Sequence, residues 1–280
     1  MIRIVEVGPR DGLQSMSGFV PTAAKVAFVD ALSLTGLTDI EVSSFVSPRW
    51  VPQLADADEV FRLIRRQNGV RYHALVPNLQ GLERAIAARA DVVAVFTAAS
   101  ETFSRKNTNA SIADTLERFA PVIAGSPVPV RGYISMAFVC PFEGPVAPER
   151  VRQVAFELIA LGCGEISLGD TIGRATPDQV RALLEVLLVD VPARQIALHC
   201  HDTFGQAVAN ALAAAEMGVQ VYDGSAGGIG GCPYAPGAPG NVSTEALVRA
   251  FPGATGIDPA RLAAASNGIN LAIQSSGTHL

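Results

Sequence analysis

Lysine is scarce in this chain of 280 residues. Of its 21 basic residues only Lys25 and Lys106 are lysines, so a mechanism built on a lysine Schiff base has two candidates. The sequence predicts Lys25 within a helix (22–34) and Lys106 within a polar loop (104–107). Because neither lies on a predicted strand, we consider a Schiff-base aldolase disfavoured.

Cysteine is also sparse, and its spacing argues against two kinds of site. The four cysteines (Cys140, Cys163, Cys200, Cys232) are scattered and form no C-x-x-C pair. This pattern predicts neither a thiolate-rich zinc site nor a disulfide framework. We expect free thiols in a reducing compartment.

A surplus of positive charge and long apolar runs are missing as well. Acidic residues outnumber basic ones, 26 to 21, for a net charge of −5, which argues against nucleic acid as a partner. No apolar run approaches the roughly 18 uncharged residues of a membrane span. Residues 1–7 are typical of a strand rather than a signal peptide. We therefore expect a cytoplasmic protein with no membrane partner.

Apolar residues, in contrast, are abundant. Hydrophobic residues make up 49% of the chain and charged residues 17%, which predicts a large core and excludes disorder as the main state. The length corresponds to roughly two average domains, but an α/β barrel often takes about 250 residues as a single one. We expect one catalytic domain over 1–280, with 258–280 as a helical extension.

Short strand-like runs alternate with helical patterns along the chain. The predicted strands are 3–7, 39–43, 71–76, 91–96, 130–136, 165–168, 196–199 and 219–224. The predicted helices are 22–34, 55–65, 112–123, 148–161, 177–188, 207–217 and, beyond the last strand, 258–273. Eight parallel β–α units of this kind predict the (β/α)8 TIM barrel of the α/β class, with an extra C-terminal helix.

The alternative fold is a doubly wound open sheet with a dinucleotide site. That fold requires a glycine-rich fingerprint after its first strand. Here the first strand leads into Gly8-Pro9-Arg10-Asp11-Gly12, which is not that motif. The barrel is therefore preferred.

Polar residues follow several predicted strands at the barrel end where active sites lie. Arg10 and Asp11 follow the first strand, and His199 and His201 end the seventh. Side chains two residues apart share one face of a strand, so both imidazoles can point into the same site. Arg10 and Asp11 could equally be a solvated turn, and a lone H-x-H pair is a weak metal signal.

Asp11, His199, His201 and Asn241 together form a mixed nitrogen and oxygen donor set. Their strands, the first, seventh and eighth, become neighbours when the barrel closes. Such a set suits an octahedral divalent cation, Mg²⁺ or Mn²⁺, better than zinc.

Other polar positions have two interpretations each. Cys232 lies in the glycine-rich loop 230–241, which is either a mobile lid or a plain hinge. Glu41 and the Asp170-Thr171 pair could serve the site, or could cap helices and satisfy buried hydrogen bonds.

Five ordered segments give the chain a family resemblance. VEVGPRDGLQ (5–14), SSFVSPRWVPQ (43–53), SLGDTIG (167–173), HCHDTFGQ (199–206) and GGCPYAPGAPGN (230–241) closely resemble the 3-hydroxy-3-methylglutaryl-CoA lyase family of metal-dependent TIM-barrel lyases. The resemblance covers nearly the whole chain. It implies retro-Claisen cleavage of 3-hydroxy-3-methylglutaryl-CoA to acetyl-CoA and acetoacetate, a place in leucine degradation, and a homodimer.

The resemblance also implies a role for each matching residue. Asp11, His199 and His201 would hold the cation, with Asn241 completing or supporting its sphere. Arg10 would stabilise the acetyl-CoA enolate, Cys232 would transfer a proton, and Asp170 and Glu41 would orient substrate and ligands. His199 is a catalytic candidate as well. The predicted substrate-binding residues are Gln14, Thr171, Arg105 and Lys106. Arg105 and Lys106 suit the CoA phosphates, although a solvated loop is the alternative for this pair.

The sequence departs from the family pattern at several places. Ser15-Met16 follows Gln14 in place of Asn-Glu, 225–228 reads Ser-Ala-Gly-Gly, Ala246 replaces an acid, and 136–140 also differs. These changes leave the metal set intact but admit a longer 3-alkyl group, such as isohexenyl. A Claisen synthase of the isopropylmalate or homocitrate type is a further alternative, although such enzymes carry Glu at the position of Leu13. A non-catalytic binding barrel is the third.

Overall fold

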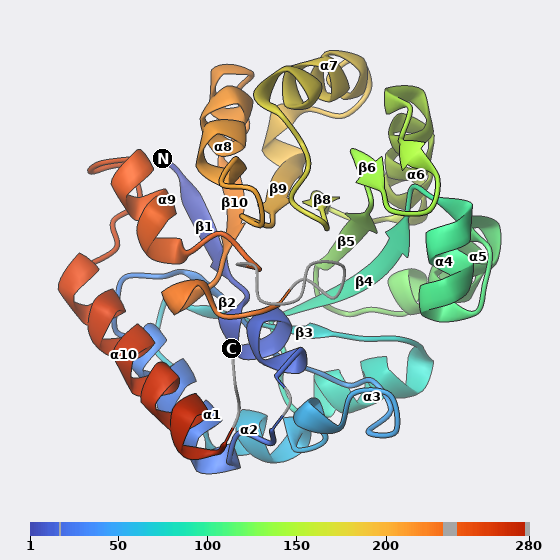
Figure 1. The fold of residues 1–280 in the computed structure, drawn as a ribbon. Coiled ribbons are helices and arrows are strands. Elements are labelled where there is room, and N and C mark those ends of the chain that lie inside the picture. Colours follow the sequence, from blue (N-terminus) through green and yellow to red (C-terminus); the bar gives the residue numbers. More distant parts are fainter. Residues whose placement is uncertain (17, 232–239, 278–280) are drawn as a thin grey trace.

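The structure is a computed structural model that describes residues 1–16, 18–231 and 240–277. Eight parallel strands close into a barrel in the order β1-β10-β9-β8-β5-β4-β3-β2 (Figure 1). The strands are β1 (Arg3–Glu6), β2 (Asp39–Ser44), β3 (Arg71–Leu75), β4 (Val92–Ala98), β5 (Val130–Ser135), β8 (Glu165–Asp170), β9 (Ile196–Cys200) and β10 (Val221–Gly224). The predicted (β/α)8 barrel is confirmed.

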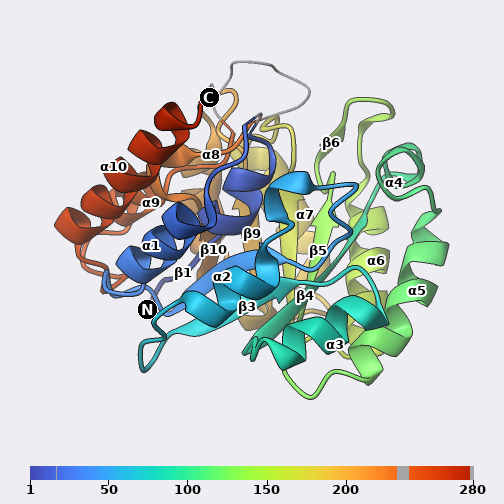
Figure 2. The ribbon, with the colours of Figure 1, turned by 90° about the horizontal axis from the view of Figure 1, so that it is seen from below.

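Helices surround the barrel and cover its outer face (Figures 1 and 2). They are α1 (Thr22–Leu32), α2 (Ala57–Leu63), α3 (Leu79–Ala87), α4 (Glu101–Thr108), α5 (Ile112–Ala124), α6 (Pro148–Leu161), α7 (Pro177–Leu187), α8 (Ala207–Glu216), α9 (Thr244–Ala250) and α10 (Pro259–Ser275). Capping boxes start two of them: Ser111 pairs with Asp114 at α5, and Thr176 pairs with Gln179 at α7. Such caps satisfy N–H groups that the first helical turn leaves unpaired.

Three helices and one hairpin were not expected from the sequence. They are α3, α4, α9 and the two-stranded sheet of β6 (Val139–Cys140) and β7 (Gly144–Pro145). The prediction of a loop around Lys106 was wrong, because Arg105 and Lys106 lie in α4. The Ser100 side chain accepts the Phe103 N–H and caps this short polar helix, and such a segment has too little apolar periodicity to be recognised.

Apolar side chains pack between the strands and the helices, whereas the barrel interior is strongly polar. In β5 the outward-facing Ile134 joins the main apolar cluster. Arg131 and Tyr133, on the opposite face of the same strand, contact Asp223 of β10 and Glu41 of β2. Because alternate residues of a strand face opposite sides, this one strand supplies both the core and the interior.

The C-terminal helix packs on the outside of the barrel. Asp258 caps α10 by accepting the N–H groups of Ala260 and Arg261, and α10 lies alongside α1 (Figure 2). The predicted helix 258–273 is therefore present. None of the helices within the described residues is both long and apolar enough to cross a membrane.

Candidate active site

The turn after β1 delivers two charged side chains to one end of the barrel. Residues Gly8–Gly12 form a short π-helical turn, in which the Val7 carbonyl accepts the N–H groups of Arg10, Asp11 and Gly12. A Cβ at Gly12 would lie 2.7 Å from Ile229 Cγ1. Only glycine allows this close approach, which holds the turn against the loop that follows β10.

The end of β9 brings two histidines beside Asp11. His199 lies in β9, and His201 forms a bridge with Asn241 just beyond it. Their rings are 5.5 Å apart. One ligand atom from each of Asp11, His199 and His201 lies within 4.8 Å of the other two. The structure thus brings together three of the four predicted metal ligands as a possible metal site.

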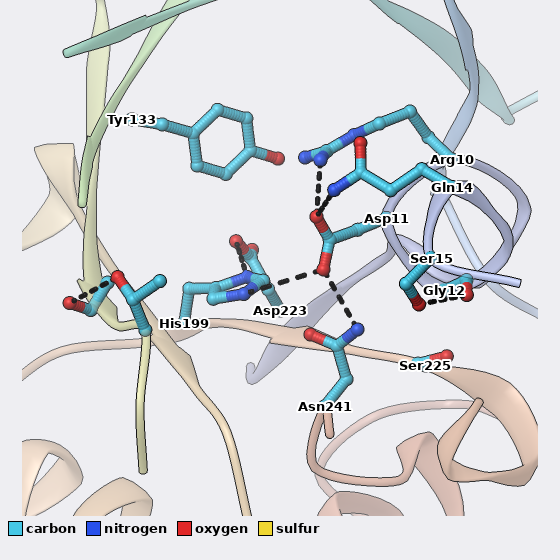
Figure 3. Close-up of polar contacts among 12 residues, drawn as sticks. Arg10, Asp11, Gly12, Gln14, Ser15, Tyr133, His199, Asp223, Ser225 and Asn241 are labelled. Atoms are coloured by element: carbon cyan, nitrogen blue, oxygen red, sulfur yellow. Dashed lines mark hydrogen bonds and ion pairs between the residues drawn. The ribbon is translucent and has the colours of Figure 1, made fainter. Parts of the chain in front are cut away.

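The donor atoms of this cluster fit a cation. His199 Nε2 lies 3.9 Å from Asp11 Oδ2. His201 Nδ1 and Asn241 Oδ1 are buried and have no hydrogen-bond partner within the described part of the chain. Figure 3 shows Asn241 Oδ1 on the side of His199, while its Nδ2 donates to Asp11 Oδ2 at 2.9 Å. Buried acceptors without donors are costly unless another group satisfies them.

The charges in the cluster also suit metal coordination. Burial raises the pKa of the Asp11 carboxyl, but Arg10 and the two histidines outweigh burial and hold it at about 2. Burial, reinforced by His199, lowers the pKa of His201 to about 4. An ionised carboxylate and a neutral imidazole are the forms that bind metal ions.

Arg10 is held rigidly next to the cluster. Its Nε donates to Glu41 Oε2 at 2.6 Å. Its Nη1 donates to Asp11 Oδ1, and its guanidinium carbon lies 5.3 Å from the centre of the Tyr133 ring (Figure 3). Burial lowers the pKa of Arg10, but Glu41 and Asp11 raise it far above its usual value. The guanidinium therefore remains charged and cannot rotate away.

Gln14, Asp170 and Thr171 surround the cluster with different contacts. Gln14 Nε2 donates to Asp11 Oδ1 at 2.8 Å. The Asp170 carboxylate, whose pKa burial raises to about 6, accepts the N–H groups of Arg174 and Ala175 at 3.0 Å each. Thr171 Oγ1 accepts the Met136 N–H at 2.9 Å. Asp170 and Thr171 thus shape the loop after β8.

The remaining predicted residues lie apart from the cluster or outside the described residues. Lys106 Nζ lies 5.0 Å from the centre of the Phe142 ring, and Arg105 pairs with Glu101 in its own helix at 3.9 Å. Cys232, with most of the predicted lid (232–239), falls outside the described residues.

The sequence analysis did not identify a set of buried polar residues behind His199. Asp223 Oδ2 lies 3.2 Å from His199 Nδ1, and Asp223 Oδ1 lies 2.6 Å from Arg131 Nη2. Burial raises the pKa of Asp223, but Arg131 and His199 hold it well below its usual value. The signal that could have identified them is a charged residue within an otherwise apolar strand.

Comparisons with known proteins agree with this geometry. The family model described as HMGL-like matches residues 1–271. The chain belongs to the HMGL-like family. It is 52% identical to the cytoplasmic 3-hydroxy-3-methylglutaryl-CoA lyase of Rattus norvegicus over 263 residues, covering 92% of this chain and 77% of the relative. Other relatives of similar identity are named as mitochondrial enzymes.

Solved structures of the family have the same fold. The HMG-CoA lyase of Brucella melitensis matches with a TM-score of 0.96 at 50% identity, over 98% of this chain and 99% of that one. An HMG-CoA lyase of Acinetobacter baumannii, solved with coenzyme A and 3-methylmalate, matches with a TM-score of 0.92 at 35% identity, over 98% and 92%. The family resemblance drawn from the sequence is confirmed.

Proposed function

We propose that this protein is a carbon–carbon lyase that cleaves 3-hydroxy-3-methylglutaryl-CoA into acetyl-CoA and acetoacetate. The observation that carries the proposal is the cluster of Asp11, His199 and His201 beside the clamped guanidinium of Arg10. The names of the relatives support the same activity. Neither a Claisen synthase nor a non-catalytic barrel is favoured by any of these findings.

The proposed cofactor is Mg²⁺ or Mn²⁺. Asp11, His199 and His201 would hold it, and the unpaired Oδ1 of Asn241 makes that residue the fourth candidate. Carboxylate, amide and imidazole donors suit these cations, and the cluster found among the described residues contains no thiolate. A bound divalent cation lowers the pKa of a ligated oxygen and neutralises charge that develops on it.

The chain's own residues meet the other demands of retro-Claisen cleavage. The tertiary hydroxyl must lose its proton to a base in the site, and its oxygen becomes the ketone of acetoacetate as the C2–C3 bond breaks. The electron pair of that bond enters the enolate of acetyl-CoA, which is then protonated at carbon. Arg10 provides fixed N–H donors for the enolate oxygen, because Glu41 and Tyr133 set its orientation. Preorganised donors of this kind act on charge that develops in the transition state. Cys232, by the family resemblance, supplies the final proton.

The acyl-CoA substrate is proposed to lie across the same end of the barrel. Gln14 and Thr171 are assigned to its acyl part, and Arg105 and Lys106 of α4 to the CoA phosphates. Coenzyme A in the structure of the Acinetobacter baumannii relative supports an acyl-CoA ligand. Both side chains are exposed and can form charge-assisted hydrogen bonds with phosphate oxygens.

The test is a panel of 3-hydroxy-3-alkylglutaryl-CoA thioesters with Mg²⁺, followed by acetyl-CoA release. We expect the 3-methyl compound to give the highest kcat/KM. A preference for the isohexenyl compound would reassign the substrate to the longer alternative. Failure of the whole panel would overturn the lyase.

Two further parts of the proposal concern the assembled protein. We propose that the protein is a homodimer and that it is located in the cytoplasm. The thiols of Cys140, Cys163 and Cys200 are buried and form no disulfide, which is compatible with a reducing compartment such as the cytoplasm. Light scattering of the purified protein tests the dimer, and a monomeric mass at micromolar concentration would contradict it.

A further inference from the structure

Asp223 contacts Nδ1 of the His199 ring, whereas Asp11 faces Nε2 (Figure 3). It lies in β10, next to His199 of β9 in the parallel pairing of the two strands. Its side chain is fully buried. Asp223 Oδ2 accepts from Ser167 Oγ at 2.9 Å and lies 3.2 Å from His199 Nδ1.

Arg131 fixes the other oxygen of this carboxylate. Its Nη2 donates to Asp223 Oδ1 at 2.6 Å, its Nη1 donates to the Tyr133 hydroxyl at 2.9 Å, and its Nε forms an ion pair with Glu165 at 2.8 Å. Each of the three guanidinium nitrogens therefore has a polar contact. Because Arg131 and Ser167 donate to its two oxygens, the Asp223 carboxylate cannot rotate. An ionised carboxylate has no proton to donate and can only accept.

This geometry determines which nitrogen of His199 carries the hydrogen. Because the Asp223 carboxylate can only accept, Nδ1 of His199 must donate to it, and in the neutral imidazole Nε2 is left with its lone pair. That lone pair lies 3.9 Å from Asp11 Oδ2, on the side of the metal cluster. In the neutral ring, Nε2 and Asp11 Oδ2 are thus two acceptors that face one another across a space where a cation can bind both.

We propose that Asp223, locked by Arg131, is a positioning residue that holds His199 as the Nδ1–H tautomer and so presents Nε2 to the cation. The proposal rests on the metal site of the proposed function. Asp223 does not touch the cation or the substrate, and it acts entirely through the His199 ring. Partners behind a metal-bound histidine commonly change metal affinity by about 10- to 100-fold when they are removed.

The isosteric substitution Asp223→Asn has a specific predicted consequence. The amide oxygen will face Arg131, since an amide NH₂ there would oppose a guanidinium N–H. The NH₂ group then takes the place of Oδ2 and donates to His199 Nδ1. The hydrogen of His199 moves to Nε2, where it faces the cation site. A carboxylate-to-amide change behind a catalytic histidine is known to fix the wrong tautomer in this way.

The experiment measures tautomer and cation affinity separately, without substrate. Two-dimensional ¹H–¹⁵N spectra of metal-free protein labelled in its histidine rings report the tautomer. Electron paramagnetic resonance reports Mn²⁺ binding. We expect Nδ1–H at His199 in the wild-type protein and Nε2–H in Asp223→Asn, with a Kd for Mn²⁺ raised about 10- to 100-fold.

Asp39→Asn is the matched control. Asp39 is also a buried carboxylate that contacts a histidine, with its Oδ1 2.8 Å from His73 Nε2, but it lies at the start of β2, at the other end of the barrel. We expect its Mn²⁺ affinity to equal that of the wild type, even where its stability falls as much as that of Asp223→Asn.

Two results would overturn the proposal. One is the Nε2–H tautomer of His199 in the metal-free wild-type protein. The other is unchanged Mn²⁺ affinity in folded Asp223→Asn. Both readouts are independent of turnover, so tight Mn²⁺ binding in a wild-type protein that cleaves no thioester would contradict the proposed function alone.

Discussion

At the scale of single residues, the site depends on side chains whose orientation is fixed by charge. Arg10 lies between the carboxylates of Glu41 and Asp11, and Asp11 in turn accepts from Gln14 and Asn241. Each bond involves a charged partner and is therefore stronger than a neutral hydrogen bond. The proposed enolate donor, Arg10, and the proposed metal ligand, Asp11, are thus neighbours in one network.

Replacing Arg10 with lysine tests whether the planar guanidinium, with its several fixed N–H donors, is needed. An ammonium keeps the charge but cannot donate to Glu41, Asp11 and an enolate in fixed directions. We expect Arg10→Lys to lower kcat by at least about 10²–10³-fold, with little change in the Kd for Mn²⁺. Steady-state kinetics and Mn²⁺ titration measure the two effects.

The exposed Arg62 of α2 provides the control for this substitution. Its ion pair with Glu59 of the same helix spans 3.7 Å. Arg62→Lys should leave both kcat and Mn²⁺ affinity unchanged. Turnover of Arg10→Lys at the wild-type rate would remove Arg10 from the mechanism.

Glu6 gives a prediction for pH. Burial raises the pKa of its carboxyl from 4.5 to about 7, against hydrogen bonds from Thr244, Ala226 and Gly8. Between pH 4.5 and about pH 7, Glu6 keeps its proton in the folded protein but loses it in the unfolded chain. The stabilisation from the bound proton is therefore lost as the pH rises through about 7. At about 1.4 kcal/mol per pH unit, the free energy of unfolding falls by about 2–3 kcal/mol between pH 5 and pH 8 from this residue.

Glu6→Gln removes this titration while keeping most of the hydrogen bonds. We expect the variant to lose about 2–3 kcal/mol less stability than the wild type between pH 5 and pH 8. Urea unfolding at both pH values gives the difference. Parallel pH dependence of the two proteins would show that Glu6 is ionised throughout the range.

The sequence predicted those site residues that follow strands and carry chemistry in their own right. Asp11, His199 and His201 were predictable because strand ends meet at one edge of a barrel. Arg131 and Asp223 were not, because each is a single charged residue within a short strand. The two residues are 92 positions apart along the chain, and only barrel closure brings them into contact.

At the scale of elements, the long helices were predicted, whereas three short ones, α3, α4 and α9, were not. Helices α5 and α7 carry regular apolar faces and capping boxes. Helix α9 spans only Thr244–Ala250 and depends on the Ser243 side chain, which accepts the Ala246 N–H. Because isolated helices of this length are not stable in water, tertiary packing decides whether they form.

Helix α10 offers a test of packing on the outside of the barrel. Leu262 of α10 is fully buried, whereas Leu271 on the same helix is 64% exposed. We expect Leu262→Ala to lower the free energy of unfolding by about 2–5 kcal/mol, because it leaves a cavity in the main apolar cluster. Leu271→Ala should change it by less than about 0.5 kcal/mol.

Urea unfolding of the two variants measures this difference directly. Both substitutions remove the same atoms from the same helix, so helix propensity cancels between them. Equal effects of the two variants would show that α10 is not docked on the barrel as described.

At the scale of the whole molecule, closure of the barrel creates the site. Strand β10 pairs with β1 on one side and with β9 on the other. This pairing brings Asp11, His199 and His201 together as a possible metal site, with Asn241 bonded to Asp11. An open sheet would leave β1 and β10 at separate edges, and the ligand set would not assemble.

The most direct measurement titrates metal-free protein with Mn²⁺, following bound Mn²⁺ by electron paramagnetic resonance and acetyl-CoA release from 3-hydroxy-3-methylglutaryl-CoA in the same samples. We expect one tight Mn²⁺ per chain, with release rising in proportion to it. Asp11→Asn should lose both, whereas Asp178→Asn, at a side chain that is 97% exposed, should lose neither. Full release from the metal-free protein, or unchanged Mn²⁺ affinity in Asp11→Asn, would contradict a cation held by Asp11, His199 and His201.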